Sequence, residues 1–391
     1  MQSFANLFDL PHHKSRRLAA LYVVALIRTF VFLLLGLFLP ILLFKLFLNQ
    51  GHNENNALLL VILVFLTHII VNGLLIIPVS KINMRFGTKT GFFISQSLVI
   101  IFLFILFFSQ NAFLIFINFM LWGVAAVFYW VSYHTFFLEV GNKKRFGEEL
   151  GLLEMLGIFS GSVAPVFAGL VIMSFGFAGL FFLCILLTFV SMFVLYYMRD
   201  TEKLESASIL YIRKEIVSKK RDFISFIGAG GVEIIYSVAW PLLLFNVFED
   251  YLKIGTVASL VVLTSVLSTF ISGKLSDRLE KNKIEKIGSA SVAVTFVTRI
   301  FFQTPASVYI IDSLYKIFSN LFYLPLNALA YYHAVDGNKT KYVVFREIGY
   351  RTGNILGLLA FLLVLCIKIP FWWVFIFAAL FSLLPMVINE A

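Results

Sequence analysis

SGKLSDRLEKNKIEK, residues 272–286, places eight charged residues in a chain that is 60% hydrophobic and only 13% charged. A second stretch, SKINMRFGTK at residues 80–89, has a similar pattern of basic and apolar residues. Ser80 to Phe86 aligns with Gly273 to Leu279 at an offset of 193 residues. A repeat at that distance indicates that the chain consists of two related halves.

Four further matches occur in the same order along the chain, at offsets of 193 to 201 residues. They are LPILLF at 39–44 with WPLLLF at 240–245, Phe128-Tyr129 with Phe322-Tyr323, GNK at 141–143 with GNK at 337–339, and Glu154 with Glu347. We therefore predict an N-terminal half over residues 1–198 and a C-terminal half over residues 223–391. The segment 199–222, which holds seven basic residues, is predicted to link them.

Long apolar segments dominate the chain, which contains 46 Phe among its 391 residues. A helix needs about 20 predominantly apolar residues to cross a bilayer, whereas a soluble core does not need such segments repeatedly. Twelve segments have this character: 18–47, 57–79, 91–109, 112–137, 149–174, 176–198, 223–248, 254–275, 286–303, 305–333, 343–367 and 370–388. The predicted fold class is an all-α integral membrane protein with twelve transmembrane helices in two pseudo-symmetric six-helix bundles.

The basic residues are distributed unequally between the two sides that this topology defines. The N-terminal tail and the loops on the same side hold 24 of the 31 Lys and Arg residues. Because Lys and Arg are concentrated in cytoplasmic loops of membrane proteins, both termini are predicted to be cytoplasmic, in a bacterial-type plasma membrane. This distribution also explains the net charge of +10 without a nucleic-acid partner.

Several other classes of protein lack support in the sequence. The first apolar run continues to about residue 47 without a small-residue cleavage pattern, so no cleaved signal peptide is predicted. Cys184 and Cys366 form no C-x-x-C pair, so neither a disulfide framework nor a cysteine metal site is predicted. We find no phosphate-binding G-x-x-x-x-G-K-S/T loop and no clustered catalytic set, and we predict no cofactor, no ATP-driven pump and no enzyme.

The two charged stretches and the two halves resemble the major facilitator superfamily of secondary transporters. Members carry a G-x-L-x-D-R-x-G-R/K-like signature between their second and third helices, which is often repeated between the eighth and ninth. The second copy here keeps four of its residues: Gly273, Leu275, Asp277 and Arg278. The first copy has Ser80 and Met84 where the family has glycine and aspartate, but it keeps Arg85, Phe86, Gly87 and Lys89.

The resemblance implies a pair of gates on the cytoplasmic side. Asp277 is expected to face a helix N-terminus in the opposite half, whose positive dipole end favours a carboxylate. Arg278 is expected to pair with Glu154, and Arg85 with Glu347. The alternative is surface pairing within one half, which contributes little free energy. Because Met84 replaces the aspartate, the two gates are predicted to be unequal.

Polar residues recur at helical spacing on two equivalent segments. The segment 112–137 carries Asn118, Trp122, Ala126, Tyr129 and Tyr133, and the segment 305–333 carries Asp312, Lys316, Asn320, Tyr323 and Asn327 at an offset of 194. Polar helix faces are costly in a membrane unless they line water or pack inward, so we interpret them as facing a central cavity. The alternative is that the Tyr and Trp residues belong to the interfacial belt.

Ionisable residues deep in the apolar segments are candidates for coupling and binding. Glu233 lies eleven residues into its segment, on the order of 15 Å at the helical rise, and is the first candidate for a proton site. Asp312 is the second candidate, although Lys316 one turn later is expected to pair with it. The alternative for Glu233 is a structural pair with Arg351.

Other charged side chains and the histidines are expected to bind the solute, to contact lipid head groups or to join helices. Arg28, Lys316 and Arg351 are alternative candidates for holding an anionic group of a substrate, and Arg299 is expected to extend to the head groups. His134 and His333 are expected to contact head groups. His68 and Asn72 are expected either to line the cavity or to form a hydrogen bond between helices.

The predicted function is secondary transport of a small organic solute by alternating access, coupled to protons. Stacking and hydrogen bonding to the solute are assigned to Trp122, Tyr129, Tyr236, Trp240, Asn320 and Tyr323, and Asn118 is also predicted to bind the solute. GIFSGSVAPVFAG at 157–169 resembles a motif of drug-exporting members and favours an exporter, although its small residues also allow close helix packing. A nutrient importer of the same fold and a non-transporting sensor are the alternatives. The expected partners of a monomer are the solute, protons and lipids.

Overall fold

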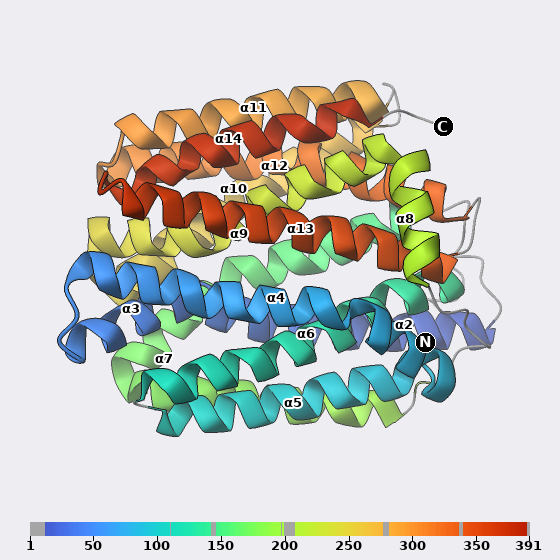
Figure 1. The fold of residues 1–391 in the computed structure, drawn as a ribbon, viewed down its shortest axis with the longest axis horizontal. Coiled ribbons are helices and arrows are strands. Elements are labelled where there is room, and N and C mark those ends of the chain that lie inside the picture. The colour runs from blue at the N-terminus through green and yellow to red at the C-terminus, as the bar shows by residue number, and fades with distance from the viewer. Residues whose placement is uncertain are drawn as a thin grey trace.

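The computed structural model of the protein describes residues 12–109, 111–141, 146–196, 198, 208–276, 281–335 and 339–388. Long helices lie side by side and run roughly parallel to the longest axis of the molecule (Figure 1). The fold is all-α, as the apolar segments predict, because a helix satisfies its own backbone hydrogen bonds inside a bilayer.

The N-terminal half begins with a broken first span. Its helices are α2 (His12–Gly36), α3 (Leu39–Asn49), α4 (Glu54–Phe86), α5 (Thr88–Phe108), α6 (Ala112–Val140) and α7 (Phe146–Tyr196). Helices α2 and α3 together cover the first apolar segment, with Pro40 in the first turn of α3. Helix α7 covers the fifth and sixth segments, which are joined at Gly176, where φ is +67°. Glycine adopts this left-handed backbone readily, so Gly176 separates the two arms of α7.

The C-terminal half follows a short linker helix. Its elements are α8 (Ile209–Ser218), α9 (Lys220–Phe248), α10 (Tyr251–Ser276), α11 (Lys281–Phe301), α12 (Pro305–Val335), α13 (Lys339–Cys366), η2 (Phe371–Val374), α14 (Phe375–Leu383) and η3 (Leu384–Val387). Helix α8 lies within the segment that we predict to be the linker. The last apolar segment is formed by η2, α14 and η3 together.

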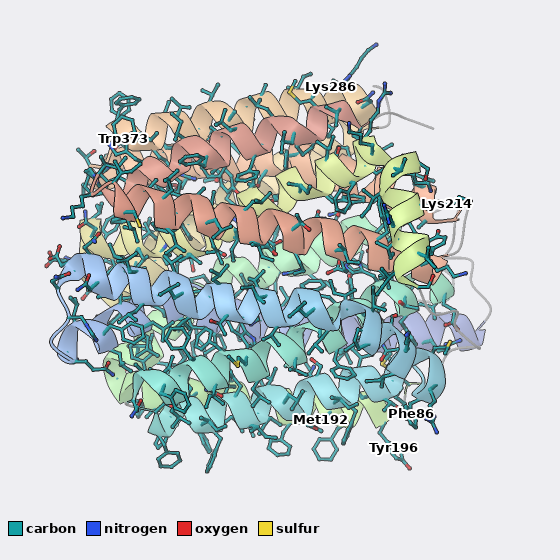
Figure 2. All side chains as sticks on the ribbon, in the orientation of Figure 1. Phe86, Met192, Tyr196, Lys214, Lys286 and Trp373 are labelled. Carbon is teal, nitrogen blue, oxygen red and sulfur yellow. The ribbon has the colours of Figure 1, made fainter. Side chains whose placement is uncertain are left out.

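The outer surface of the bundle is apolar. Phe113, Phe193 and Phe182 are among the exposed aromatic residues, with 71–74% of each side chain accessible. Figure 2 shows side chains projecting outward along the helices, and within the described residues seven helices are long and apolar enough to cross a membrane. The protein is therefore an integral, multi-pass membrane protein.

The two ends of the bundle differ in charge. Helix α2 begins, and η3 ends, at the end of the bundle where α8 lies (Figure 1). Lys214 and Lys286 lie at this end, and Trp373 lies at the opposite one (Figure 2). We call the first the basic end and the second the distal end.

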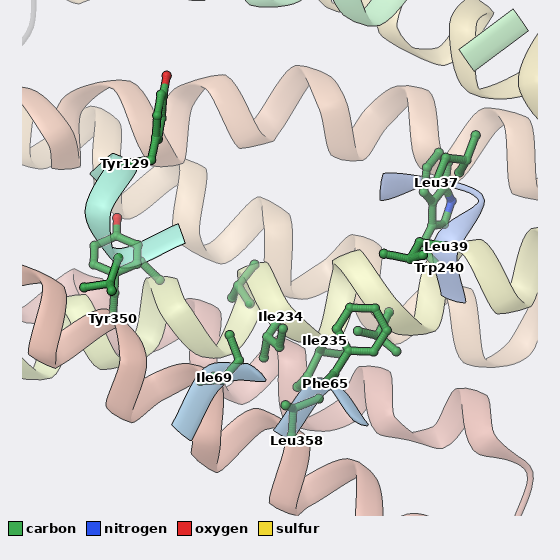
Figure 3. Close-up of a cluster of buried hydrophobic side chains, with 14 of the residues drawn as sticks. Leu37, Leu39, Phe65, Ile69, Tyr129, Ile234, Ile235, Trp240, Tyr350 and Leu358 are labelled. Carbon is green, nitrogen blue, oxygen red and sulfur yellow. The ribbon is translucent and has the colours of Figure 1, made fainter. Parts of the chain in front are cut away.

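Apolar side chains from both halves meet in the middle of the bundle. Phe65 and Ile69 of α4 lie next to Ile234 and Ile235 of α9, and Leu358 of α13 completes the contact (Figure 3). All five are buried. This contact holds α9 and α13 against the N-terminal half and fixes the side chains that lie between them.

The small residues of the segment 157–169 pack against α10. A Cβ added at Gly255 of α10 would lie 2.3 Å from the carbonyl oxygen of Pro165. The backbone N–H of Val166 donates to Ser259 Oγ at 3.1 Å. The segment therefore serves close packing between the halves, which is one of the two interpretations that its sequence allows.

Helices α9 and α13 cross with their backbones in contact. A Cβ added at Gly353 would lie 2.0 Å from the carbonyl oxygen of Ile227, and one at Gly230 would lie 2.2 Å from that of Tyr350. Asn354 Nδ2 donates to the carbonyl oxygen of Gly230 at 2.7 Å and ties the two helices together. The crossing thus sets the distance between Glu233 and α13.

Replacing Gly353 with alanine is expected to destabilise the protein by about 1–3 kcal/mol, because the added methyl group must push the two backbones apart. The measurement is the melting temperature of the purified protein in detergent. Gly157→Ala is the matched control, since a Cβ at Gly157 meets no heavy atom within 4 Å. An equal melting temperature for Gly353→Ala and the native protein would contradict this account of the crossing.

Candidate functional site

Glu233 lies in the middle of α9 with its side chain exposed, although its neighbours Val232 and Ile234 are buried. Its carboxylate interacts electrostatically with groups of α13. The charged groups that it faces are Arg346, Glu347 and Arg351. An accessible carboxylate among charged groups between helices is more stable in contact with water than in contact with lipid. The structure thus brings Glu233 and Arg351 together, as the sequence suggested.

A cluster of polar groups connects the two halves between Glu233 and the basic end. We call it the inter-half cluster, and its members are His134 of α6, Asn327 and Tyr331 of α12, and Arg346 and Glu347 of α13. Arg346 donates to His134 Nε2 at 2.9 Å, to Glu347 Oε1 at 2.8 Å and to Asn327 Oδ1 at 2.9 Å. His134 Nδ1 lies 2.6 Å from Tyr331 Oη.

The geometry fixes how His134 is protonated within the inter-half cluster. A guanidinium group has only donors, so His134 Nε2 must accept the hydrogen bond from Arg346. The proton of the neutral imidazole is then on Nδ1, where it can be donated to Tyr331 Oη. Glu347 Oε1 lies only 3.5 Å from His134 Nε2 and offers an alternative partner if the ring gains a second proton.

Three expectations about these residues are corrected by the structure. His134 is buried at the inter-half contact and does not reach the head groups. Arg346, one of the 24 basic residues that the charge count places on the cytoplasmic side, has only 7% of its surface exposed. Arg85 and Glu347 do not pair among the described residues, because Arg85 is exposed over the ring of Phe86 while Glu347 is buried beside its helix neighbours Arg346 and Arg351.

The other predicted gate falls largely outside the described part of the chain. Asp277 and Arg278 are not among the described residues, nor is the side chain of Glu154. Lys89, which the first copy of the signature keeps, donates to the backbone carbonyl of Tyr196 at 3.1 Å. Gly87 forms the turn between α4 and α5 with φ of +87°, which explains the glycine at this position of the signature.

A second buried cluster lies in the C-terminal half. Asp312 of α12 forms an ion pair with Arg299 of α11 and accepts a hydrogen bond from the indole N–H of Trp240. The guanidinium of Arg299 also lies 4.6 to 5.5 Å from the centres of four aromatic rings: Tyr236, Phe296, Tyr315 and Phe375. We call this group the caged ion pair.

The caged ion pair corrects one further expectation and extends another. Arg299 does not extend to the head groups, since only 2% of its surface is exposed. Asp312 forms an ion pair with Arg299 on the neighbouring helix, in addition to its electrostatic interaction with Lys316. Because both members are buried and matched, Asp312 is held as the charged form by a fixed counter-ion, which makes it a poorer proton carrier than Glu233.

Aromatic residues form one wall of the site on the C-terminal half. Tyr236 is stacked between Trp240 and Tyr315, with ring centres at 5.0 and 4.4 Å. Lys316 Nζ lies 5.5 Å from the centre of the Tyr236 ring. Two more predicted residues of this wall, Asn320 and Tyr323, are half-buried on the same helix as Lys316.

A second wall of predicted residues lies in the N-terminal half. The guanidinium of Arg28 lies 5.0 Å from the centre of the Tyr129 ring, which stacks on Tyr133 at 5.8 Å. Trp122 stacks on Phe102 at 5.3 Å. Arg28, Phe102 and Trp122 also line a small hollow of about 20 Å³, which is room for about one water molecule.

Two amide side chains point away from this wall. Asn118 is fully buried and donates to the carbonyl oxygen of Phe102 at 2.9 Å, so it joins α6 to α5 and does not face the cavity. Asn72 donates to the carbonyl oxygen of Gly123 at 3.4 Å, which is the inter-helix hydrogen bond that the sequence offered as one alternative. The ring of His68 packs at a tilt against Trp122, with ring centres 4.3 Å apart.

One more histidine has a role that the sequence did not predict. His333 Nδ1 lies 2.8 Å from Asp222 Oδ2, and Tyr342 Oη donates to the same oxygen at 2.7 Å. His333 therefore joins α12 to the start of α9 and does not face the head groups. This contact fixes the helix ends that follow the linker in the C-terminal half.

Two bundles of long apolar helices with charged groups buried between them define a membrane transporter. A sequence profile of the Major Facilitator Superfamily matches residues 19–221, just over half of the chain. The chain therefore belongs to the Major Facilitator Superfamily, and it is a secondary transporter and not an enzyme. A search of curated proteins found no match to the sequence.

Solved transporters share the whole fold at low sequence identity. The human organic anion transporter MFSD10 matches with a TM-score of 0.73 and 11% identity, covering 96% of this chain and 99% of that chain. A variant of the E. coli fucose:proton symporter FucP matches with a TM-score of 0.67 and 11% identity, covering 96% and 97%. FucP in its outward conformation matches with a TM-score of 0.69 and 11% identity, covering 95% and 97%.

Proposed function

We propose that this chain transports a small organic solute together with protons, and that Glu233 is the residue that carries the proton. The observation that supports this most directly is the exposed carboxylate of Glu233 in the middle of an otherwise buried helix. A carboxylate that water can reach at membrane depth can gain and lose a proton during a transport cycle. The fold is shared with a fucose:proton symporter and an organic anion transporter, and proton coupling and organic solutes are thus within its range.

The arrangement of contacts supports an alternating-access cycle. At the distal end, Phe38 of the N-terminal half packs on Tyr251 with ring centres 6.0 Å apart, and Lys45 lies 5.1 Å from the same ring. Towards the basic end, the inter-half cluster joins the halves through His134 and Arg346. The halves therefore touch on both sides of Glu233. Breaking one set of contacts while keeping the other would expose the centre to one side of the membrane.

The predicted binding residues other than Asn118 each have a place in this proposal. Arg351 and Lys316 supply positive charge, and the other members contact the body of the solute: Trp122, Tyr129, Tyr236, Trp240, Asn320 and Tyr323. Arg85, Glu154, Asp277 and Arg278 remain the proposed gate on the cytoplasmic side, where we also place both termini. The resemblance of the segment 157–169 to exporters supports outward transport.

The test is proton movement in proteoliposomes that contain a pH-sensitive dye and are challenged with a panel of organic solutes. The native protein is expected to move protons when the correct solute is added, and Glu233→Gln is expected to lose at least about nine-tenths of this signal. The physical reason is that glutamine is similar in shape to the acid but cannot exchange a proton.

Glu54→Gln is the matched control for this experiment, since Glu54 is exposed in the first turn of α4 at the distal end. It is expected to keep the full proton signal. Solute-dependent proton movement that persists in Glu233→Gln would transfer the proton role to Asp312. A native protein that moves protons with none of the solutes would overturn the proton-coupled proposal.

A further inference from the structure

Arg351 is buried but incompletely paired. Only 9% of its surface is exposed, and its Nη2 makes one long hydrogen bond of 3.5 Å to Glu347 Oε2. Its Nε is buried and has no hydrogen-bond partner among the described residues. Leaving a charged donor in this state costs free energy, so binding of a further acceptor here would be favourable.

Glu347 cannot fully neutralise Arg351, because it is shared. Its other oxygen accepts a 2.8 Å hydrogen bond from Arg346. One carboxylate thus lies between two arginines, and Glu233 is the second carboxylate that interacts with them. The four groups sum to zero charge when Glu233 is ionised, and to one positive charge when Glu233 is protonated.

No other described group near Glu233 and Arg351 neutralises the positive charge that remains when Glu233 is protonated. The tyrosines that face Glu233 are uncharged donors and acceptors: Tyr315, Tyr323 and Tyr350. The imidazoles of His68 and His134 face the arginines from α4 and α6 and carry no negative charge. Asp312 is already matched by Arg299 in the caged ion pair.

The N-terminal half adds further positive charge to the centre. Arg28 interacts with the ring of Tyr129, and no described carboxylate pairs with it. A buried cation without a counter-ion is costly and is compensated when an anion binds nearby. Each half therefore contributes a cation that no described carboxylate fully neutralises: Arg28 in the N-terminal half and Arg351 in the C-terminal half.

We infer that Arg351 binds an anionic group of the solute, and that this anion and a proton on Glu233 bind together. This inference rests on the proposed transport function and specifies its substrate class as small organic acids. The carboxylate of the solute takes the place of Glu233 as the counter-ion of Arg351, and the displaced negative charge of Glu233 is cancelled by a proton from water. A monoanion and one proton then cross the membrane with no net charge.

The proposed linkage between proton binding and anion binding predicts how the anion affinity changes with pH. Because the proton and the anion each make the other's binding more favourable, they move in the same direction, and the affinity for the anion must rise as the pH falls. A transporter in which proton and solute compete for Glu233 would show the opposite trend. Outward transport of an acid with a proton is compatible with this sign, since the gradients set the direction.

The test is the melting temperature of the purified protein with matched probes between pH 8 and pH 5. Benzoate, lactate and succinate are the anionic probes, benzamide is the neutral probe and benzylammonium is the cationic probe. Only anions are expected to stabilise the protein, and the affinity for at least one of them is expected to rise by up to about tenfold per pH unit on acidification.

Variants separate the anion site from the proton site. Arg351→Gln is expected to lose stabilisation by anions, Arg351→Lys to keep charge selectivity at lower affinity, and the exposed control Arg213→Gln to behave like the native protein. Glu233→Gln is expected to bind the anion at least as tightly as the native protein at low pH, with no dependence on pH.

The outcomes for the inference and for the proposed function are distinguishable. Stabilisation by benzamide or benzylammonium equal to that by benzoate would overturn the inference. So would failure of all three carboxylates to bind, anion affinity that falls on acidification, or unchanged binding in Arg351→Gln. Anion binding that needs Arg351, together with proton movement that survives in Glu233→Gln proteoliposomes, would retain the anion site and reject Glu233 as the proton carrier.

Discussion

Asp312→Asn is expected to destabilise the protein by about 3–5 kcal/mol, because it leaves Arg299 buried without a counter-ion. Arg299 has 2% and Asp312 has 1% of its surface exposed, so water cannot replace the lost partner. The aromatic rings around the guanidinium offer some compensation, about 2 kcal/mol for a desolvated cation–π contact, which is too little to replace an ion pair. The measurement is the melting temperature in detergent.

Two comparisons make this prediction specific. Asp250→Asn is the matched control, since Asp250 caps α10 by accepting from the N–H of Lys253, and asparagine caps a helix equally well. The double variant Asp312→Leu with Arg299→Met removes both charges and is expected to recover most of the lost stability. If Asp312→Asn had the same melting temperature as the native protein, the ion pair between Asp312 and Arg299 would not stabilise the fold.

The same substitution is expected to affect the site itself. Asp312 accepts from the indole N–H of Trp240, which in turn stacks on Tyr236. The caged ion pair thus fixes the aromatic wall on the C-terminal half. The role of the caged ion pair is to position Trp240 and Tyr236. Because the charge of Asp312 is matched by Arg299, Asp312 is a weaker candidate for the proton carrier than Glu233.

The sequence predicts the architecture because membrane insertion depends on properties that can be counted along a chain. The length of the apolar segments indicated the helices, and the offset between Ser80 and Gly273 indicated the repeat. The turn between the fifth and sixth segments also matches Gly176, whose positive φ separates two helical arms. These features depend on local composition, so they need no knowledge of tertiary contacts.

The partners of buried charges could not be predicted in the same way. Depth along a helix does not reveal which way a side chain faces, so Asn118 was expected in the cavity although it bonds to Phe102. Arg299 lies near the end of its apolar segment, which suggested contact with head groups, yet Asp312 is thirteen residues away on the next helix. A neighbouring charge across a short loop was the signal that could have indicated this pair.

The inter-half cluster was missed for a related reason. His134 and Arg346 are separated by 212 residues and lie at the ends of their apolar segments. Both were therefore assigned to the membrane surface, where such residues are common. Only the association of the two halves removes them from that surface.

The inter-half cluster leads to the second large effect that we expect. Arg346→Met removes the group that donates hydrogen bonds to His134, Glu347 and Asn327. The hydrogen bond between Arg346 of α13 and His134 of α6, which connects the two halves, is therefore lost. A hydrogen bond to a charged group contributes about 1.5–3 kcal/mol. A loss of about 1.4 kcal/mol changes an equilibrium tenfold, so the variant is expected to favour a state that is open at the basic end.

Distances between spin labels measure this opening directly. Labels replace Lys81 of the N-terminal half and Lys220 of the C-terminal half, which are both exposed, after the native Cys184 and Cys366 have been changed to serine. The main distance is expected to lengthen by several ångströms in Arg346→Met. The variant is also expected to keep its melting temperature within a few degrees, because Glu347 remains paired with Arg351.

Arg17→Met is the matched control for the opening. Arg17 forms an ion pair with Glu139 at 2.9 Å, but both residues belong to the N-terminal half, so its loss leaves the contact between halves intact. The control is expected to show the native distance distribution. If Arg346→Met also showed the native distribution, the apolar contacts between α4, α9 and α13 would be sufficient to close the basic end, and His134 and Arg346 would be packing residues without a role in the cycle.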